Sequence, residues 1–199
     1  MRTVPDWLNH LRRDRRGLPV PHINLWGDAD DSTRFRIERE ADYVNRPAIF
    51  FDDDYAGDPD FTKQSFQRQR ECMIGGYCQV CSRPVPWRRR LLVLGDLSVE
   101  QIEVDGSPYV AVTEPWLDTQ CAEFALQHCP ALIRRRREEN LTLVAIESPD
   151  QVRFAISTGY VDGPLHAVSA VLEPAMFAKA LLGSYTPVAT IPAEEASDG

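Results

Sequence analysis

The sequence predicts a small single domain of the α+β class, with short antiparallel hairpins and two to four helices. Three β-rich runs follow one another from 90 to 115, separated by the turn signals Gly95–Asp96 and Asp105–Gly106. The next stretch is typical of an amphipathic helix, because its apolar residues recur at helical spacing: Cys121, Phe124, Ala125, His128, Cys129 and Leu132. A chain of 199 residues is long enough to bury a core of its own.

The first part of the chain, 1–61, is expected to pack on the core as extended segments. Pro19 and Pro21 exclude a regular helix from the stretch "RRGLPVPHINLWG". Further along, Ala48–Phe51 is typical of a short strand, and it runs into an acidic loop rich in turn residues.

A central module is expected at 62–137. Its first helix would begin near Thr62, a candidate N-cap, and end where Gly75–Gly76 interrupt the helical pattern. The β-rich runs and the amphipathic helix follow. Pro130 lies inside that helical stretch, so a kink or a restart is expected there.

The remaining chain, 138–185, is expected to add a strand pair and a helix. The runs "LTLVAIE" and "QVRFAIST" indicate two strands joined by a turn at Ser148–Asp150. The stretch Glu173–Leu182 favours a helix. The last segment, 186–199, is expected to be a mobile tail.

Composition narrows the class of protein. The chain is 43% hydrophobic and 26% charged, as in globular domains, and it lacks the run of about 18 apolar residues that a membrane span requires. Its N-terminus has no signal-peptide core, so we expect a cytoplasmic protein. There, the five cysteines are expected to be metal ligands or buried thiols rather than disulfides. The net charge of −8 excludes bulk attraction to nucleic acid.

The cysteine spacing predicts a zinc site. Treble-clef modules pair a C-x-x-C turn with two further ligands where a helix begins, and a hairpin separates the two pairs. Here "CQVC" supplies Cys78 and Cys81, the β-rich runs fill the interval, and Cys121 opens the amphipathic helix. Asp118 stands three residues before Cys121. We therefore expect tetrahedral Zn²⁺ bound by Cys78, Cys81, Asp118 and Cys121, with Zn–S distances of about 2.3 Å.

Asp118 has an alternative role, because aspartate is favoured as a helix N-cap. If it only caps the helix, the fourth ligand is Cys72, a residue of the His128–Cys129 pair, or water. The His128–Cys129 pair lies about 10–12 Å along the helix from Cys121, which is too far to share one ion. We therefore interpret His128 and Cys129 as core residues, and Cys72 as a buried thiol at a helix end.

Three stretches carry a resemblance to a known group: "RDRRGLPVPHINLWG", "QRQRECMIGGYCQVCSRPVPWRRR" and "TEPWLDTQCAEFALQHCPAL". In these the chain resembles uncharacterised actinobacterial and actinobacteriophage proteins with a C-x-x-C…C zinc-binding-like pattern. The resemblance covers about the first two thirds of the chain. It implies Cys78, Cys81 and Cys121 as ligands and Cys129 as a core cysteine before Pro130. The chain departs from the pattern at Asp118, where His or Cys is the usual ligand.

These observations favour a zinc-stabilised, phage-type interaction protein without catalytic activity. Its expected partner is a host protein. Nucleic acid is the less favoured partner, and the arginines that would contact it are Arg88, Arg89, Arg90, Arg134, Arg135, Arg136 and Arg137. The alternatives are a virion component and a metal-dependent hydrolase on an HNH-like nuclease scaffold. The hydrolase is disfavoured because no histidine lies between Cys81 and Cys121 to act as a general base.

Overall fold

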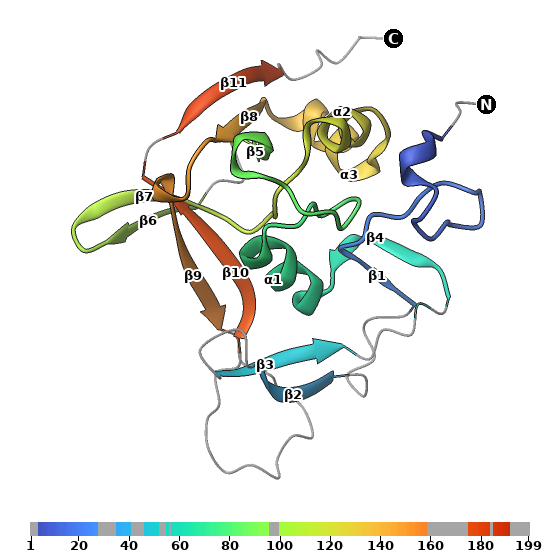
Figure 1. Ribbon diagram of the computed structural model, residues 1–199, viewed down its shortest axis with the longest axis horizontal. Helices are drawn as coiled ribbons and strands as arrows, with labels where there is room; N and C mark the ends of the chain where they lie inside the picture. Colours follow the sequence, from blue (N-terminus) through green and yellow to red (C-terminus); the bar gives the residue numbers. More distant parts are fainter. Residues whose placement is uncertain are drawn as a thin grey trace.

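The computed structural model describes residues 4–27, 35–40, 46–51, 55, 57–95, 100–158, 175–183 and 185–191. Within these ranges the chain is an α+β protein (Figure 1), as predicted. The helices are α1 (Phe66–Gly75), α2 (Thr119–His128) and α3 (Pro130–Glu138). The strands are β1 (Asn24–Trp26), β2 (Phe35–Glu40), β3 (Arg46–Phe51), β4 (Pro59–Gln64), β5 (Arg90–Gly95), β6 (Glu100–Val104), β7 (Ser107–Val112), β8 (Leu141–Ile146), β9 (Val152–Thr158), β10 (Ala175–Leu182) and β11 (Thr186–Ile191).

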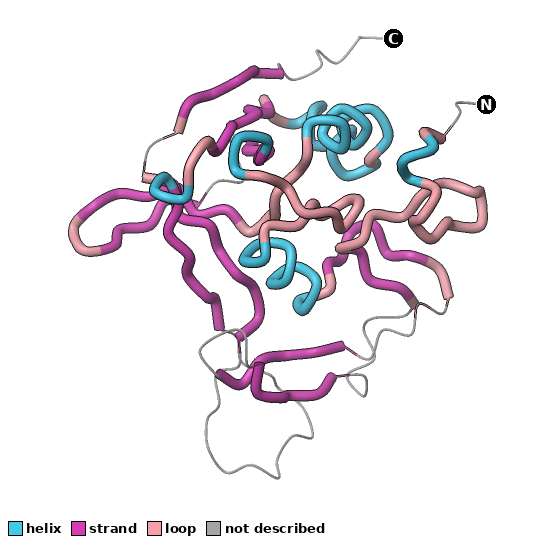
Figure 2. The backbone as a smooth tube through the Cα atoms, viewed as in Figure 1, coloured by secondary structure: helices cyan, strands magenta, loops and turns pink. Residues whose placement is uncertain are grey.

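The described strands form three small sheets. One pairs β1 with β4, a second has the order β11-β8-β5, and the largest has the order β2-β3-β10-β7-β6 with β9 also paired to β10. Pairing is antiparallel except between β3 and β10. Loop segments rather than strands cross the centre of the molecule, between α1 and the α2–α3 pair (Figure 2).

Several predicted elements are confirmed. The described stretch with Pro19 and Pro21 forms no helix, as predicted, and it leads through turns and an isolated bridge at Pro19 into β1. Ala48–Phe51 belongs to β3. The turn Asp105–Gly106 joins β6 to β7, and both residues have the positive φ angles of a tight hairpin turn, 53° and 74°. Pro130 starts α3 at the end of α2, so the predicted restart occurs there. The acidic triplet at 52–54 lies outside the described residues.

Other predicted elements are wrong. β5 pairs with β8 instead of forming a hairpin with β6, so the turn signal at Gly95 does not join neighbouring strands. β8 and β9 belong to different sheets and are not the predicted strand pair. The expected helix ending at Leu182 is the strand β10, and the expected mobile tail begins with the strand β11, paired to β8.

The first helix also begins later than predicted. Thr62 lies in β4, and the N-cap of α1 is Ser65, whose hydroxyl accepts from the Arg68 backbone N–H at 3.4 Å. Gly76 ends the helix with φ of 74°, and its amide nitrogen donates to the Cys72 carbonyl. No helix of the described part is long and apolar enough to span a membrane.

Two of the buried clusters join most of these elements. One contains Cys78, Cys81 and Cys121 and joins the N-terminal turn, α2 and β5. The other surrounds Trp116, which is fully buried, and joins α1, β5, β8 and β10. The Trp116 indole N–H donates to the Met73 carbonyl at 2.6 Å, which ties the loop before α2 to the end of α1.

Gly76 is predicted to be intolerant of a side chain for two separable reasons. Its φ is in the left-handed region, and a Cβ there would meet the Arg90 guanidinium, which lies 3.6 Å from the Trp87 ring centroid and is fixed to the Val85 carbonyl. Gly76→Ala should lower the free energy of unfolding by about 2–4 kcal/mol in urea titrations.

Gly106 provides the matched control. It has the same φ of 74°, but a Cβ there would meet nothing within 4 Å. Gly106→Ala should therefore lower the free energy of unfolding by about 1 kcal/mol, which is the cost of the left-handed backbone conformation alone. Equal losses in the two variants would show that Arg90 accommodates the methyl group and would contradict the packing argument.

Candidate metal centre

Three cysteines from two distant segments meet in the core. The Sγ atoms of Cys78, Cys81 and Cys121 all lie within 4.8 Å of one another, and the three residues are 0%, 3% and 1% exposed. Cys78 and Cys81 lie on the loop after α1, which we call the cysteine loop (Tyr77–Pro86), and Cys121 lies in the first turn of α2. The structure thus brings together the three thiols that the spacing predicts, and they can hold a metal ion.

The cysteine loop turns back on itself tightly. The Cys78 backbone N–H donates to the Arg83 carbonyl at 2.9 Å, and the Ser82 N–H donates to the Cys78 carbonyl at 2.8 Å. Ser82 adopts a positive φ of 54°, and Tyr77 and Pro84 form an antiparallel bridge below the turn. These bonds place both thiols on the same side of the loop.

Two sets of backbone hydrogen bonds bring α2 to this loop. Leu117 exchanges both of its backbone bonds with Leu91 of β5, each at 2.9 Å. The Gln79 N–H donates to the Trp116 carbonyl, also at 2.9 Å. The start of α2 is therefore fixed against β5 on one side and the cysteine loop on the other, which carries Cys121 to the two loop thiols.

Contacts among the three thiols favour the thiolate form of Cys81. Hydrogen bonds from the Cys121 thiol and then the Cys78 thiol lower the pKa of Cys81 well below its usual range, against the effect of burial. The hydrogen bonds with Cys78 and Cys81 raise the pKa of the Cys121 thiol. The backbone amide of Arg83 also lowers the pKa of Cys81. A buried site that stabilises a thiolate among further thiols suits a cation that prefers sulfur ligands.

Asp118 is the N-cap of α2. Its Oδ1 accepts from the Gln120 backbone N–H at 3.1 Å, and its Oδ2 lies 2.7 Å from Nη2 of Arg89. Among the described residues, the group of ligand atoms within 4.8 Å consists of the three cysteine sulfurs. The structure thus shows the capping bond of the alternative role, and the carboxylate contacts Arg89 and the Gln120 amide; the role of Asp118 as a zinc ligand stays a prediction.

The other residues considered for the fourth position are not in the group of ligand atoms that lie within 4.8 Å of one another. Cys72 is a buried thiol whose Sγ is 3.9 Å from the Cys78 carbonyl, and burial raises its pKa. His128 packs on Phe124, with ring centroids 4.5 Å apart, and Cys129 is the residue between α2 and α3.

Two histidines contact the cysteine loop, and the sequence did not predict these contacts. The Nε2 atom of His10 lies 2.9 Å from the Cys81 carbonyl oxygen. The His22 backbone N–H donates to the Val80 carbonyl at 3.0 Å. Burial and the nearby Arg68 lower the pKa of His22 to about 4, although Cys81 opposes the shift. Local spacing holds no signal for either contact, because both histidines are far from the loop in sequence.

The arginines of the two basic runs are partly engaged within the chain. Arg90 is buried on Trp87, and burial lowers its pKa. Arg89 pairs with Asp118, and Arg135 pairs with Glu139 at 2.8 Å and with Glu114 at 3.4 Å. These three arginines have structural partners, so the two runs are not a uniform, freely available basic surface.

Comparisons with known proteins assign no family to the chain. It matches no family model, no curated protein and no solved structure. The cysteine cluster and its surroundings are therefore interpreted from their geometry and chemistry.

The capping role of Asp118 predicts a stability effect without loss of metal. Asp118→Ala should lower the free energy of unfolding by about 1 kcal/mol, and Asp118→Asn by less, because asparagine also caps helices. The exposed pair with Arg89 adds little. Elemental analysis should find the same metal content in both variants and the wild type. Metal loss from a folded Asp118→Ala protein would make the carboxylate a ligand.

His22 predicts a pH dependence of stability. Its folded pKa of about 4 is below the ordinary histidine value of 6.5, so the unfolded chain binds more protons between these two pH values. The contribution of neutral His22 to the free energy of unfolding is fully present above about pH 6.5. This contribution, about 1–3 kcal/mol, is lost as the pH falls towards 4.

The measurement compares unfolding free energies of wild type and His22→Gln from pH 4 to 7. Glutamine does not titrate, so the difference between the two proteins should change with pH in the stated direction. Acid release of a bound metal affects both proteins and cancels in this difference. A constant difference across the range would contradict a depressed pKa.

Proposed function

We propose that Cys78, Cys81 and Cys121 bind one structural Zn²⁺ in a treble-clef-like module, and that the domain so stabilised is a binding protein for a protein partner. The observation that supports the metal is the convergence of three buried thiols within 4.8 Å. Tetrahedral zinc with Zn–S distances of about 2.3 Å requires sulfurs about 3.8 Å apart, so the observed grouping suits it.

The chemistry of the donors favours zinc. Thiolate ligands select Zn²⁺, Cu⁺ or iron–sulfur clusters, and Zn²⁺ is the usual ion of isolated structural Cys sites. The module would consist of the cysteine loop, the β6–β7 hairpin in the interval, and α2 with Cys121 in its first turn. The small sheets are joined through loops, and metal binding would stabilise the folded state at this junction.

Burial favours a structural role over a hydrolytic one. The three cysteines are almost fully buried and do not line the adjacent cavity, whereas Val80, Leu117 and Ala125 do. A substrate in that cavity would be separated from the metal by these side chains. A catalytic zinc needs an open position that substrate or water can reach, and this arrangement disfavours one.

The edge of the β11-β8-β5 sheet favours a protein as the partner. Among the described strands, β11 lies at the edge of its sheet, and its Val188 side chain is 60% exposed. Figure 1 shows β11 at the periphery of the molecule. An edge strand offers backbone hydrogen-bonding groups to another chain, and an exposed apolar side chain adds contact area.

The test is metal content by elemental mass spectrometry combined with thermal unfolding. We expect one zinc per chain and a lower melting temperature after treatment with a strong chelator. Cys121→Ser should lose the zinc, whereas Cys129→Ser, which changes a cysteine outside the cluster, should retain it.

Cobalt substitution keeps the test informative if Cys121→Ser does not fold. Co²⁺ in the wild-type protein should show thiolate-to-metal charge-transfer absorption together with the visible bands of tetrahedral cobalt. Protein that folds with no bound metal although zinc is supplied in excess would overturn the proposal. Zinc that exchanges rapidly and supports cleavage of nucleic acid would instead favour the hydrolase alternative.

A further inference from the structure

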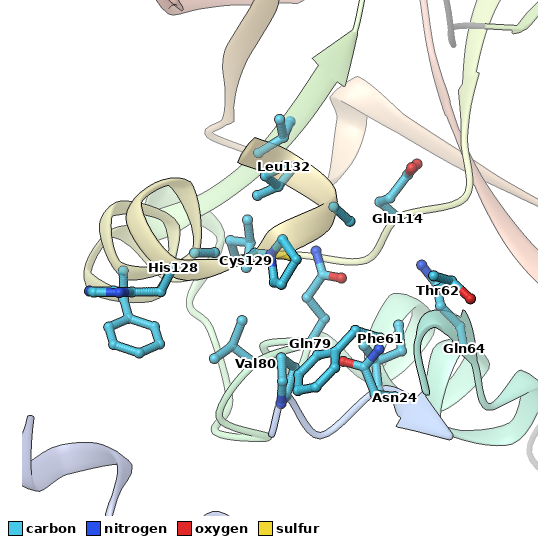
Figure 3. Close-up of a pocket in the computed structure, with 18 of the residues that line it drawn as sticks. Asn24, Phe61, Thr62, Gln64, Gln79, Val80, Glu114, His128, Cys129 and Leu132 are labelled. Atoms are coloured by element: carbon cyan, nitrogen blue, oxygen red, sulfur yellow. The ribbon is translucent and has the colours of Figure 1, made fainter. Parts of the chain in front are cut away.

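A cavity of about 290 Å³ lies beside the cysteine cluster and is not part of it. Figure 3 shows His128, Cys129 and Leu132 of the α2–α3 corner on one side, and side chains of β4 and the cysteine loop on the other. The N-terminal segment contributes to the wall through Pro19 and Ile23. The cavity is therefore lined by segments that are far apart in the sequence.

The walls of this cavity are mainly apolar. Aliphatic, aromatic and proline side chains line most of it, including Ile23, Phe61, Val80, Leu117, Phe124 and Leu132. A site of this size and lining suits a small apolar group, such as a medium-length alkyl chain or one aromatic ring.

The polar groups at the α3 side favour an anion. Cys129, Pro130 and Ala131 lie at the N-terminal end of α3 and line the cavity, and the N-cap residue Cys129 makes no side-chain capping bond. Pro130 has no N–H and the Cys129 N–H donates to the Ala125 carbonyl, so the uncapped amides at this end are those of Ala131 and Leu132. Uncapped helix amides attract negative charge. Arg134, on the second turn of the same helix, is exposed and also lines the cavity.

The remaining charged groups of the lining are already compensated. Arg16 pairs with Asp14 at 3.2 Å. Glu114, the acidic residue of the lining, pairs with Arg135 at 3.4 Å, so its charge opposes an incoming anion less than a free carboxylate would. The electric charge at this side of the cavity is therefore set by Arg134 and the α3 amides, although the whole chain has a net charge of −8.

Gln79 adds a fixed polar group to the same cavity. Its Nε2 donates to the Pro115 carbonyl at 2.9 Å, which orients the side-chain amide. Figure 3 shows the Gln79 side chain among the lining residues, between the cysteine loop and the α2–α3 corner. An oriented amide beside apolar walls provides the directional contact that small-molecule sites use for orientation.

We propose that this cavity binds an apolar carboxylate, with the apolar body against Ile23, Phe61 and Leu117 and the carboxylate at the N-terminus of α3 beside Arg134. The carboxylate belongs either to a free carboxylic acid or to the C-terminal residue of a peptide. The site does not require the metal to contact the ligand, so it goes beyond the binding function proposed above.

The first experiment compares three probes of equal chain length by isothermal titration calorimetry: octanoate, octylammonium and octanol. Octanoate should bind most tightly, and octylammonium most weakly, because only the carboxylate complements Arg134 and the helix amides. Equal binding of octanoate and octylammonium, or no binding of octanoate at millimolar concentration, would overturn the proposal.

Two exposed arginines of α3 provide matched variants. Arg134 lines the cavity and Arg137 does not. Arg134→Gln should weaken octanoate binding about fivefold to tenfold and leave octanol unchanged, whereas Arg137→Gln should leave both unchanged. Equal effects of the two variants would show a general charge effect and would contradict a site at Arg134.

Cys129 provides an independent readout of position, because its thiol lines the cavity whereas Cys78, Cys81 and Cys121 are buried elsewhere. Octanoate should slow alkylation of Cys129 by iodoacetamide, as measured by peptide mass spectrometry. Binding without protection of Cys129 would place the ligand outside this cavity and overturn the proposal.

A pair of short peptides distinguishes the two sources of the carboxylate. A tetrapeptide ending in leucine with a free carboxylate should compete with octanoate if the site takes chain termini, and the same peptide with a C-terminal amide should not. Competition by neither peptide, with octanoate still bound, assigns the site to free acids. Competition by both would contradict recognition of the carboxylate.

Discussion

The packing of the cysteine loop on α2 depends on three sulfur atoms that are held together in the buried core. Cys78, Cys81 and Cys121 approach within 4.8 Å although they come from the cysteine loop and from α2. Negative charge on these buried sulfurs is costly unless hydrogen bonds or a cation compensate it. The loop bonds at Arg83 and the paired bonds between Leu91 and Leu117 position the thiols, so a cation would occupy a site that the backbone has already shaped.

Trp116 connects this cluster to the rest of the molecule. Its carbonyl accepts from Gln79 in the cysteine loop, and its indole donates to Met73 at the end of α1. Its ring lies 5.9 Å from that of Trp87, and Arg90 lies over both rings. The loop before α2 therefore contacts both the cysteine loop and α1, and it couples the position of the cysteines to α1 and to the sheet that contains β5 and β8. A displaced cysteine loop would disturb both buried clusters.

The sequence predicted local features better than pairings between distant segments. The Cys78–Cys81 spacing, the start of α2 and the Asp105–Gly106 turn depend on neighbouring residues, and all three are found. The segment Ala175–Leu182 contains good helix formers, yet it forms β10 because it pairs with β3, β7 and β9, and that pairing overrides local propensity. The contact of His10 with the cysteine loop and the cavity itself join distant segments, so spacing held no signal for them.

The cysteine cluster and the cavity share a wall, and this links their roles. Val80, Leu117 and Ala125 pack with the cysteines in one core cluster and also line the cavity. Packed cores respond to displacement of their members by rearrangement or loss of contacts, because they contain little free volume. A metal that fixes the cysteine loop relative to α2 would therefore also fix the shape of the cavity. The metal would then contribute to ligand binding through the position of this wall, without touching the ligand.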